Sequence, residues 1–581
     1  MIVYRDQRSQ ADPHRLLLQL TSVANRSCVS APGHDEAVEL VIETGVLESA
    51  VADTLFPEID GIHPLAQRLR QASVEAGHIL WHTWHGNHDQ ARRWGARLAL
   101  SLREIPAQQF PRTVEISVPE GYAYYAVYPE MYLESAKRFH AEAGSCGVVC
   151  LGLRSIGTSL SAVVAAALEE LGCTVKSCTL RPRGHPYARR PRISAELETQ
   201  LRHMPRSYFL LIDEGPGLSG SSLAGTAALL RSWGIEDDHI LLFPSWQTDG
   251  AHLVSADARE QWPRHPQFTV SFEEVWIDSA RLSAAFPCEL RDLSAGAWRQ
   301  EVYREVTEYP AVHPQHERRK YLLTSAGTAD GAQLLSFAGL GQPAWRKVDR
   351  LARLADAGFS VGPDGLTHGF LRRPFVPGVA VSPEQVNVEL VERAAAYLAH
   401  LCREHAIEPS VDDESLREMI TTNVGEGLQH PSGASLRGSL PAGGWVERPV
   451  ALDGRMLAHE WLRTPQGILK VDAMDHHDDH FFPGCQDIAW DVAAAVVELN
   501  LNGQGRSHLV ARYRQLSGDS GITSRLHHYA IAYLAFRLGY TTLATSVLGQ
   551  TADAVRFSHQ ARRYARLLTS ELNASAACWN G

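Results

Sequence analysis

The sequence predicts a multidomain α/β protein with three parts, and three patterns carry this prediction. Residues 1–135 space their apolar side chains three and four apart, as in HPLAQRLRQASVEAG, which predicts a helical region. Residues 136–309 alternate short apolar runs such as GVVCLGL and YFLLIDE with helical stretches, an order typical of a parallel sheet covered by helices. Residues 310–581 begin with two strand-like runs and continue mainly as helices, which predicts an α+β domain.

Composition narrows the class of protein. The chain has 581 residues, and at roughly 100 to 200 residues per domain it is too long for one domain. Its apolar fraction of 44% and net charge of −11 exclude a disordered chain and a general nucleic-acid binder. The N-terminus has no apolar signal segment, no run approaches the ~20 apolar residues of a membrane span, and the cysteines are scattered. A soluble, cytoplasmic protein is therefore expected, with no membrane partner and with a homo-oligomer left open.

An acidic pair follows the apolar strand-like run YFLLI in the middle of the chain. Asp213 and Glu214 come directly after it, and the small-residue loop GPGLSGSS and a helix come next. Backbone N–H groups in such a loop, together with the positive N-terminus of a helix, can hold phosphate oxygens. Carboxylates at the end of a strand can bind ribose hydroxyls or magnesium-bound water. The alternative is a strand-to-helix turn with a solvated acidic pair.

At these residues the chain resembles the type I phosphoribosyltransferases, which bind phosphoribosyl pyrophosphate (PRPP) with an apolar strand, two acids and a loop rich in Thr, Ser and Gly. The resemblance implies that Arg154, Ser155 and Gly157 belong to a pyrophosphate loop, and that RPRGHPYARRPR, from 181 to 192, is a basic hood loop. The phosphate loop is about one residue longer here than the family pattern. The resemblance implies substrate-binding roles for Gly217, Ser219, Gly220, Ser221, Ser222 and His185.

The reaction implied by this resemblance is transfer of ribose 5-phosphate with release of pyrophosphate. Arg154, Arg181, Arg183 and Mg2+ would take up the charge of the leaving pyrophosphate, while Asp213 and Glu214 fix the ribose. The acceptor is a small molecule or nucleobase that no residue identifies. The helical N-terminal region is a candidate hood over the acceptor.

A second cluster is rich in histidine. In HILWHTWHGNHDQARRW, one continuous helix would place His78, His82, His85 and Asp89 on one face, at a spacing compatible with metal ligation. The alternatives are a packing surface whose histidines bond to backbone or water, and an aromatic pocket for the acceptor.

The C-terminal region resembles aminoglycoside phosphotransferases and protein kinases in its order of a strand pair, helices, a second strand pair and an acidic segment. The resemblance implies that Asp472, after the strand GILKV, binds metal, and that Asp487 or Asp491 in DIAWDVA has a structural role. The family's His-Gly-Asp motif is absent. The nearest candidates are Asp453 for the base, His459 for the second metal ligand and Lys320 for the nucleotide lysine, with ATP as the cofactor.

The segment from 472 to 480 is the densest set of metal-ligand side chains in the chain. A hard cation would use its carboxylates and zinc its histidines. The predicted ligands of a divalent metal are Asp472, Asp475, His476, Asp479 and His480.

Three functions fit these patterns. The leading prediction is an Mg2+-dependent phosphoribosyltransferase-like enzyme with an appended kinase-like domain, acting on a small phosphorylated substrate. The alternatives are a non-catalytic sensor of PRPP or nucleotide that signals through the C-terminal domain, and a small-molecule phosphotransferase.

Overall fold

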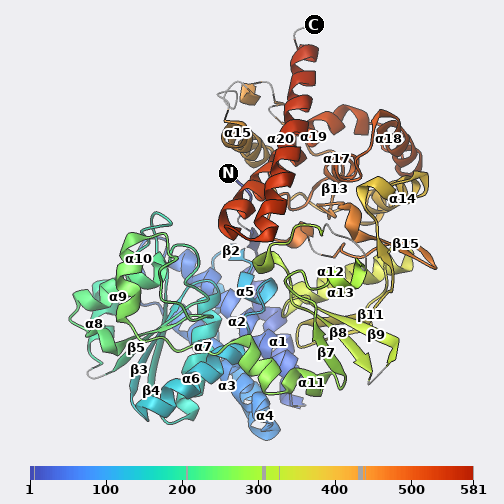
Figure 1. Cartoon of the computed structure of the whole chain (residues 1–581). Helices are drawn as coiled ribbons and strands as arrows, with labels where there is room; N and C mark the ends of the chain where they lie inside the picture. Colours follow the sequence, from blue (N-terminus) through green and yellow to red (C-terminus); the bar gives the residue numbers. More distant parts are fainter. Residues whose placement is uncertain are drawn as a thin grey trace.

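The computed structural model describes residues 1–5, 7–29, 31–204, 207–303, 309–325, 328–429, 436–438, 440–441, 443–474 and 476–579. Figure 1 shows three regions: a layer of N-terminal helices at the lower centre, a parallel sheet at the lower left, and a C-terminal half with a small sheet below a group of helices.

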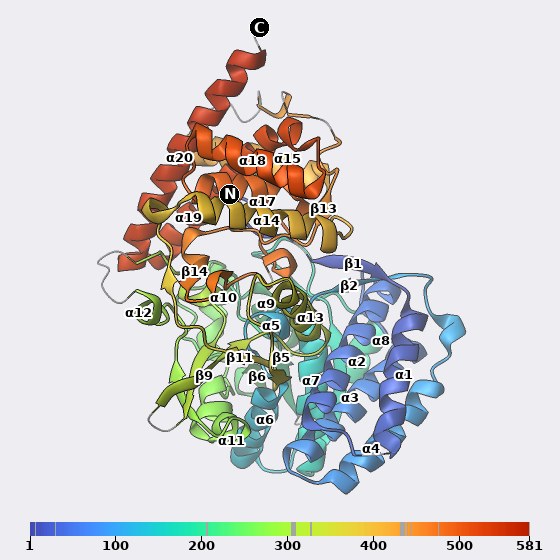
Figure 2. The same ribbon diagram turned by 90° about the vertical axis from the view of Figure 1, so that its right-hand side faces the viewer.

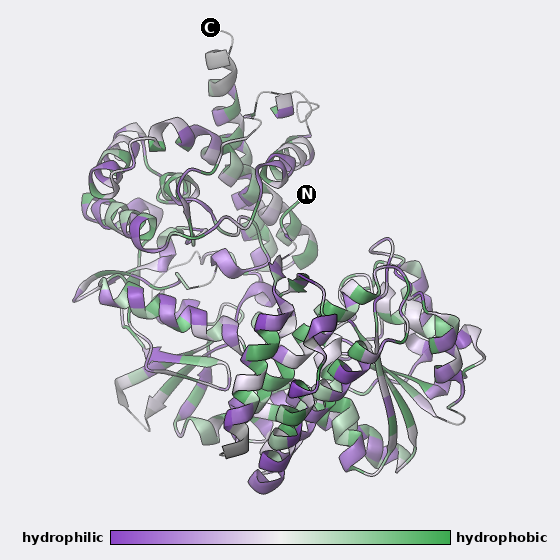
Figure 3. Cartoon of the chain, turned by 180° about the vertical axis from the view of Figure 1, so that it is seen from behind, coloured by the Kyte–Doolittle hydropathy of each residue, from purple (hydrophilic) through white to green (hydrophobic). Residues whose placement is uncertain are grey.

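The N-terminal region is helical, as the sequence predicts. Its four long helices pack beside one another and against a helix of the parallel-sheet region, α7 (Ile156–Glu170) (Figure 2). They are α1 (Pro13–Val29), α2 (His34–Leu55), α3 (Pro64–Trp84) and α4 (His88–Arg103). The close packing depends on small residues, because a Cβ added at Gly77 of α3 would lie 2.8 Å from the Ala162 carbonyl oxygen of α7. The hydrophobic and hydrophilic stretches that alternate along these helices are visible in Figure 3.

The predicted single helix through the histidine-rich stretch is wrong. Helix α3 ends at Trp84, and Gly86 has a φ of +70°, a left-handed conformation that interrupts the helix. Helix α4 begins at His88, so His88 and Asp89 belong to a different helix from His78 and His82.

The central region contains a four-stranded sheet in which all strands are parallel. Its strands are β3 (Gly147–Leu153), β4 (Thr174–Leu180), β5 (Tyr208–Ile212) and β6 (Ile240–Phe243), in the order β4-β3-β5-β6. Alternate residues of β3 enter two different cores: Val148 and Cys150 pack with the N-terminal helices, whereas Val149 and Leu151 pack beside α8 (Ala195–Arg202) and α9 (Ser221–Ser232). Both faces are therefore covered, which explains the continuous apolar runs.

The order of these strands reverses between β3 and β5. From β3 the chain crosses to β4 on one side, and then returns to place β5 on the other side. In an open α/β sheet the crevice outside the carboxyl ends of the two strands at such a reversal is the usual ligand site. Residues 153–157 and 213–221 therefore lie at the favoured edge of the sheet.

The C-terminal half consists of an antiparallel sheet followed by a lobe of helices, as the sequence predicts. The sheet order is β10-β11-β9-β8-β7. Its elements are β7 (Glu289–Asp292), β8 (Lys320–Ser325), β9 (Thr328–Phe337), α13 (Gln342–Asp356), β10 (Gly365–Thr367) and β11 (Phe370–Pro374). Because β7 pairs with β8, the sheet begins before the boundary predicted at residue 310.

The helical lobe surrounds the second predicted strand pair, which is the hairpin of β14 (Trp461–Thr464) and β15 (Gly467–Lys470). The helices of the lobe are α14 (Val388–Glu404), α15 (Asp413–Leu428), α17 (Ala489–Glu498), α18 (Gly503–Ser517), α19 (Ile522–Leu548) and α20 (Ala552–Trp579). Helix α19 is long and apolar enough to cross a membrane by length and composition, contrary to the sequence-based expectation that no segment is. Its most apolar window is 67% buried within the protein, so it is weak evidence for a span.

The first residues of the chain lie in the helical lobe, far along the sequence from their neighbours (Figure 1). The Ile2 amide donates to Asn423 Oδ1 at 2.6 Å, and Tyr4 forms a β-bridge with Phe481. The chain then passes through β1 (Arg8–Ala11), which pairs with β2 (Val114–Ser117), before it enters α1 (Figure 2). The N-terminal region is thus tied to the C-terminal half.

Candidate functional site

Two sites contain the predicted functional residues. We call the region outside the carboxyl ends of β3 and β5 the sheet-edge site, and the region around the β14–β15 hairpin the hairpin site.

The acidic pair of the sheet-edge site is half-buried and bonds to uncharged partners. The Gly121 amide donates to Glu214 Oε2 at 3.1 Å, and the Tyr132 hydroxyl donates to the Asp213 carbonyl oxygen at 2.7 Å. Burial raises the pKa of Asp213 to about 6. Burial, reinforced by the charges of Glu120 and Asp213, raises the pKa of Glu214 to about 8. Glu214 therefore holds a proton at neutral pH, which makes it a hydrogen-bond donor as well as an acceptor.

The predicted phosphate loop has the backbone shape of a small-residue turn. Gly217 and Gly220 have φ values of +57° and +65°, and a Cβ at Gly220 would lie 2.8 Å from Leu253. Ser219 Oγ accepts the Ser221 amide at 3.3 Å, while the Ser221 hydroxyl donates to the Pro186 carbonyl oxygen at 2.7 Å. Helix α9 begins at Ser221, so its N-terminus faces this loop.

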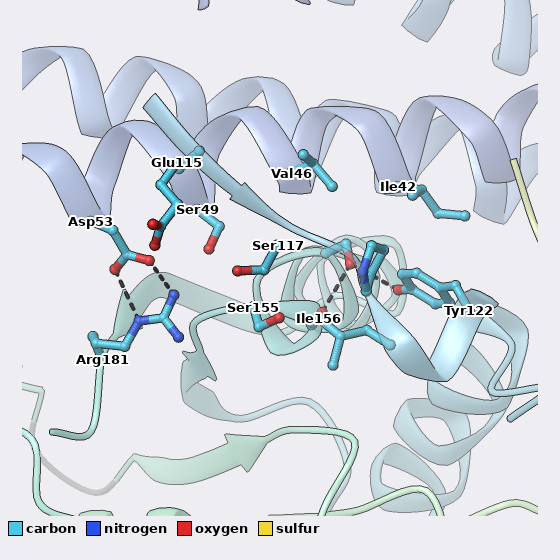
Figure 4. Close-up of a pocket in the computed structure, with 13 residues that line it drawn as sticks. Ile42, Val46, Ser49, Asp53, Glu115, Ser117, Tyr122, Ser155, Ile156 and Arg181 are labelled. Atoms are coloured by element: carbon cyan, nitrogen blue, oxygen red, sulfur yellow. Dashed lines mark hydrogen bonds and ion pairs between the residues drawn. The ribbon is translucent and has the colours of Figure 1, made fainter. Parts of the chain in front are cut away.

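The predicted pyrophosphate arginines are paired with acids that the sequence did not single out. Arg154 Nε lies 2.7 Å from Asp53 Oδ1, and Arg154 also pairs with Asp60. Arg181 pairs with Asp53, as Figure 4 shows, and Arg183 Nη2 lies 3.2 Å from Asp60 Oδ1. An anion at this edge of the sheet must compete with two carboxylates for these guanidinium groups. The pairing argues against the strongly positive hood surface that the sequence predicts.

The rest of the basic loop lies at the surface. Arg190 pairs with Asp257 at 3.0 Å and Arg192 with Glu58 at 3.5 Å, and both arginines are exposed. His185 is also exposed, and its Nδ1 accepts the Tyr187 amide at 3.3 Å.

A pocket lies beside the pair of Asp53 and Arg181 (Figure 4). It is lined by Ile42, Val46, Ser49, Ala50, Asp53, Glu115, Ser117, Pro119, Tyr122, Ser155, Ile156, Ser159 and Arg181. Ser155 has a φ of +125°, a strained conformation for a residue with a Cβ and one that clusters at functional sites. A Cβ at Gly157 would lie 2.6 Å from the Ile212 carbonyl oxygen, so the start of α7 lies against the end of β5.

The histidine-rich stretch makes no metal site among the described residues. His78 stacks on Trp94 with ring centroids 3.8 Å apart, and its two nitrogens lie 2.7 Å from Glu170 and 2.9 Å from Glu169. His82 bonds to the same Glu170, whereas Asp89 is 85% exposed on the next helix. The geometry therefore favours the alternative of a packing surface between α3 and α7.

At the hairpin site, Asp453 is not available as a catalytic base. Its Oδ2 accepts the Tyr397 hydroxyl at 2.8 Å and lies 2.9 Å from Lys470 Nζ, while its Oδ1 accepts the Met456 amide at 3.1 Å. Lys470 also lies 2.9 Å from Glu460 Oε2, and all three charged side chains are buried. Burial opposes the ionised form of Asp453, yet the Lys470 charge holds the pKa of Asp453 below its usual value. The predicted base is thus a member of a closed, charged triad.

Two aspartates fix the backbone of this segment, in agreement with the structural role expected for them. Asp491 accepts the amides of Asp453 and Gly454 at 2.7 and 2.8 Å. Asp487 accepts the amides of Glu447 and Arg448, both at 2.8 Å. Burial, with the nearby Asp453 charge, raises the pKa of Asp491 to about 7.

A group of potential metal ligands lies beside the triad. Glu460, Asp472 and His476 offer ligand atoms that all lie within 4.8 Å of one another. His476 Nδ1 hydrogen-bonds to the Asp453 carbonyl oxygen at 2.8 Å, which assigns the proton to Nδ1 and leaves Nε2 free to bind a cation. Glu460 was not among the ligands predicted from the sequence, which included its neighbour His459. The His459 ring stacks on Trp298 instead, and burial lowers the pKa of His459 to about 3.

The other predicted ligands lie elsewhere. Asp479 lies 3.6 Å from Arg318, and His480 Nε2 lies 3.0 Å from the Tyr125 hydroxyl, so the structure does not bring them into the group of Glu460, Asp472 and His476. Asp475 falls outside the described residues. Lys320, the predicted nucleotide lysine, pairs with Glu317 at 3.4 Å.

Arg373 on β11 is a buried cation beside Asp472 that the sequence analysis also missed. Its Nη2 donates to the Val471 carbonyl oxygen at 3.1 Å, while Nη1 has no hydrogen-bond partner among the described residues. Burial lowers the pKa of Arg373, and the Asp472 charge opposes this effect. Arg373 therefore offers a guanidinium N–H group next to the candidate metal ligands.

One segment connects the two sites. Gly121 and Tyr132 bond to the acidic pair of the sheet-edge site, and Tyr122 shares a 2.8 Å hydrogen bond with Ser159. Between them, the Tyr124 hydroxyl bonds to the Asp478 carbonyl oxygen, next to the hairpin site. Residues 119–132 therefore contact both sites, and we call them the connecting segment.

Comparisons with known proteins find similar solved structures over about half of this chain. No protein-family model and no curated protein matches the chain. The choline kinase LicA from Streptococcus pneumoniae is 14% identical, with a TM-score of 0.31, over 47% of this chain and 98% of that one. A choline/ethanolamine kinase family protein from Mesorhizobium loti is 17% identical, with a TM-score of 0.35, over 51% and 98%. The macrolide 2'-phosphotransferase MphH from Brachybacterium faecium is 13% identical, with a TM-score of 0.31, over 50% and 98%.

Each of these matches spans about half of this chain, and at such identities and TM-scores the likeness carries no information on activity or substrate. A function for this half of the chain can therefore be inferred only from the residues of the hairpin site.

Proposed function

We propose that the C-terminal half is a small-molecule phosphotransferase that binds a nucleoside triphosphate with a divalent cation at the hairpin site. The observation that carries this proposal is the convergence of Glu460, Asp472 and His476 beside the buried cations Lys470 and Arg373. A divalent cation bound there would bridge and neutralise phosphate oxygens. Two carboxylates suit Mg2+ or Mn2+, and the imidazole nitrogen shifts the preference toward Mn2+.

The residues of this chain would divide the work as follows. Lys470 holds Glu460 in place through the buried ion pair, and Asp491 holds the backbone on which Asp453 and Gly454 lie. The free Nη1 group of Arg373 would donate to a phosphate oxygen. In the reaction, an acceptor hydroxyl oxygen would form a bond to the γ-phosphorus, the bond from that phosphorus to the diphosphate oxygen would break, and the hydroxyl proton would pass to water. Such transfers depend mainly on positioning and charge stabilisation, so the occupied Asp453 does not exclude them.

A binding experiment tests this proposal. Titration calorimetry of the full chain with an unhydrolysable ATP analogue and Mn2+ is expected to give saturable binding, weakened about tenfold or more in Asp472→Asn. Asp413→Asn, at the start of the distant helix α15, is the matched control and should bind as the unmodified chain does. Binding that is unchanged in Asp472→Asn contradicts the proposal.

PRPP-dependent transfer at the sheet-edge site is the second candidate function. One observation favours it: the half-buried acids Asp213 and Glu214 follow β5 at the point where the strand order reverses, beside a small-residue loop and a helix N-terminus. A sugar phosphate is the ligand class that this arrangement suits. The ion pairs of Arg154 and Arg181 weigh against a strong pyrophosphate site.

A measurement of pyrophosphate release distinguishes a PRPP transferase from a PRPP sensor at the sheet-edge site. The full chain would be incubated with PRPP, Mg2+ and pooled small-molecule acceptors, with Asp213→Asn as the comparison. Release that depends on Asp213 supports transfer, whereas Asp213-dependent binding of PRPP without release supports a sensor. No binding of PRPP contradicts both.

A further inference from the structure

A pocket beside the candidate metal ligands lies between the segment 476–483 and helix α19. It is lined by Gly454, Arg455, His476, Asp479, Phe481, Phe482, Pro483, Phe536, Arg537 and Tyr540. His476 belongs both to this pocket and to the candidate metal group. A molecule in the pocket would therefore lie next to the phosphates of a nucleotide held at the hairpin site.

Two charged side chains of this pocket, Asp479 and Arg537, are paired with residues outside its lining. Asp479 lies 3.6 Å from Arg318, which is not among the residues that line the pocket. Arg537 bonds to the Tyr564 hydroxyl at 3.2 and 3.3 Å, and its Nε lies 3.7 Å from Glu498. Each of these two charges thus has an opposite charge nearby.

Arg455 is different. It is half-buried, and its guanidinium makes no direct hydrogen bond or ion pair among the described residues; burial lowers the pKa of Arg455, but the more distant charges of Tyr540, Glu460 and Asp472 raise it overall. Its own backbone is fixed, because its carbonyl oxygen accepts the Tyr533 hydroxyl at 3.0 Å. A guanidinium that lines a pocket without a partner favours a ligand with an anionic group, which it can bind through two parallel N–H groups.

The remaining wall of the pocket is aromatic. Phe481, Phe482, Phe536 and Tyr540 line it, and the rings of Phe481 and Tyr540 are 5.5 Å apart in an edge-to-face arrangement. Aromatic walls with a few polar groups are typical of sites for small organic molecules.

We propose that this pocket binds the acceptor of the phosphotransferase, and that the acceptor is a small molecule with an apolar body and a carboxylate or phosphate group held by Arg455. This inference rests on the proposed function only in giving the bound molecule the role of acceptor, because binding of the anion requires no nucleotide. Arg455 would repel a cationic group in the pocket, so the inference predicts an anionic acceptor.

The first test compares three probes on the unmodified full chain without nucleotide: phenyl phosphate, phenylacetate and phenyltrimethylammonium. Calorimetry is expected to detect binding of at least one of the two anions and none of the cation. The stronger of the two anions identifies phosphate or carboxylate as the preferred group. Binding of the cation, or of neither anion, overturns the inference.

The second test locates the binding. Arg455→Gln is expected to weaken the preferred anion about tenfold or more, Arg455→Lys to retain part of the affinity, and Arg403→Gln, at an exposed position of α14, to change nothing. Equal affinity in Arg455→Gln and the unmodified chain overturns the inference.

The outcomes for the two proposals are distinguishable. Anion binding that depends on Arg455, without nucleotide binding that depends on Asp472, retains the pocket and removes the phosphotransferase. Nucleotide binding that depends on Asp472, without anion binding that depends on Arg455, does the reverse.

Discussion

The sheet-edge site and the hairpin site combine acids and cations in opposite ways. At the sheet edge, Asp213 and Glu214 are half-buried without a basic partner in bonding distance among the described residues, while Arg154 and Arg181 pair with Asp53. At the hairpin, Lys470 is buried between Asp453 and Glu460, and Arg455 makes no direct ion pair with any described residue. Burial raises the pKa of Glu214 to about 8 at the sheet edge, whereas at the hairpin the Lys470 charge lowers the pKa of Asp453 in spite of its burial. The comparison shows that the neighbours of a charged side chain affect its pKa more than its residue type does.

The largest expected effect is at the Lys470 triad. Lys470→Met leaves Asp453 and Glu460 buried without a cation, and breaking a buried ion pair from one side costs about 3–5 kcal/mol of unfolding free energy. Urea unfolding followed by circular dichroism measures this loss. Arg181→Gln at the sheet edge is the comparison, because Asp53 keeps Arg154 as a partner; its expected cost is about 1 kcal/mol. Equal costs would remove the contrast between the two sites.

The next effect is the pH dependence contributed by Glu214. Its pKa is about 8 in the folded chain against 4.5 ordinarily, so the folded state holds a proton that the unfolded state releases between these values. Stability is therefore full below about pH 4.5 and falls as pH rises toward 8. Glu214→Gln should flatten this fall by up to an order of 3 kcal/mol. Urea unfolding at pH 5 and pH 8 measures it, with Glu196→Gln on α8 as the control. A slope unchanged in Glu214→Gln would show that the carboxyl is ionised.

A smaller effect concerns the paired arginines. If Asp53 competes with anions for Arg154 and Arg181, then Asp53→Asn should bind pyrophosphate about tenfold more tightly than the unmodified chain. Calorimetry with magnesium pyrophosphate measures this, and Asp257→Asn, which frees only the exposed Arg190, is the control. Weaker or unchanged binding in Asp53→Asn would mean that the ion pair does not restrict the site.

The sequence predicted the strands and the acidic residues of both sites better than the residues with which the charged side chains pair. The strands β3 to β6 and the acids after β5 were predictable because apolar runs and small-residue loops are local patterns. The pairing of Arg154 with Asp53 joins residues about a hundred positions apart through a helix that the sequence could not orient. Glu460 was not predicted as a ligand either, because only the fold of the hairpin brings it close to Asp472 and His476.

The smallest effect tests whether the connecting segment links the two sites. The Tyr124 hydroxyl bonds to Gln7 and to the Asp478 carbonyl oxygen, so Tyr124→Phe removes one anchor of the segment beside the hairpin site and should cost about 1 kcal/mol. Hydrogen exchange is expected to rise at residues 477–481, measured by mass spectrometry. Thr545→Ala, which removes a hydroxyl on the far end of α19, is the control. If exchange also rises at residues 213–221, the two sites share a mechanical connection through Gly121 and Tyr132; if it stays confined to 477–481, the segment anchors each site separately.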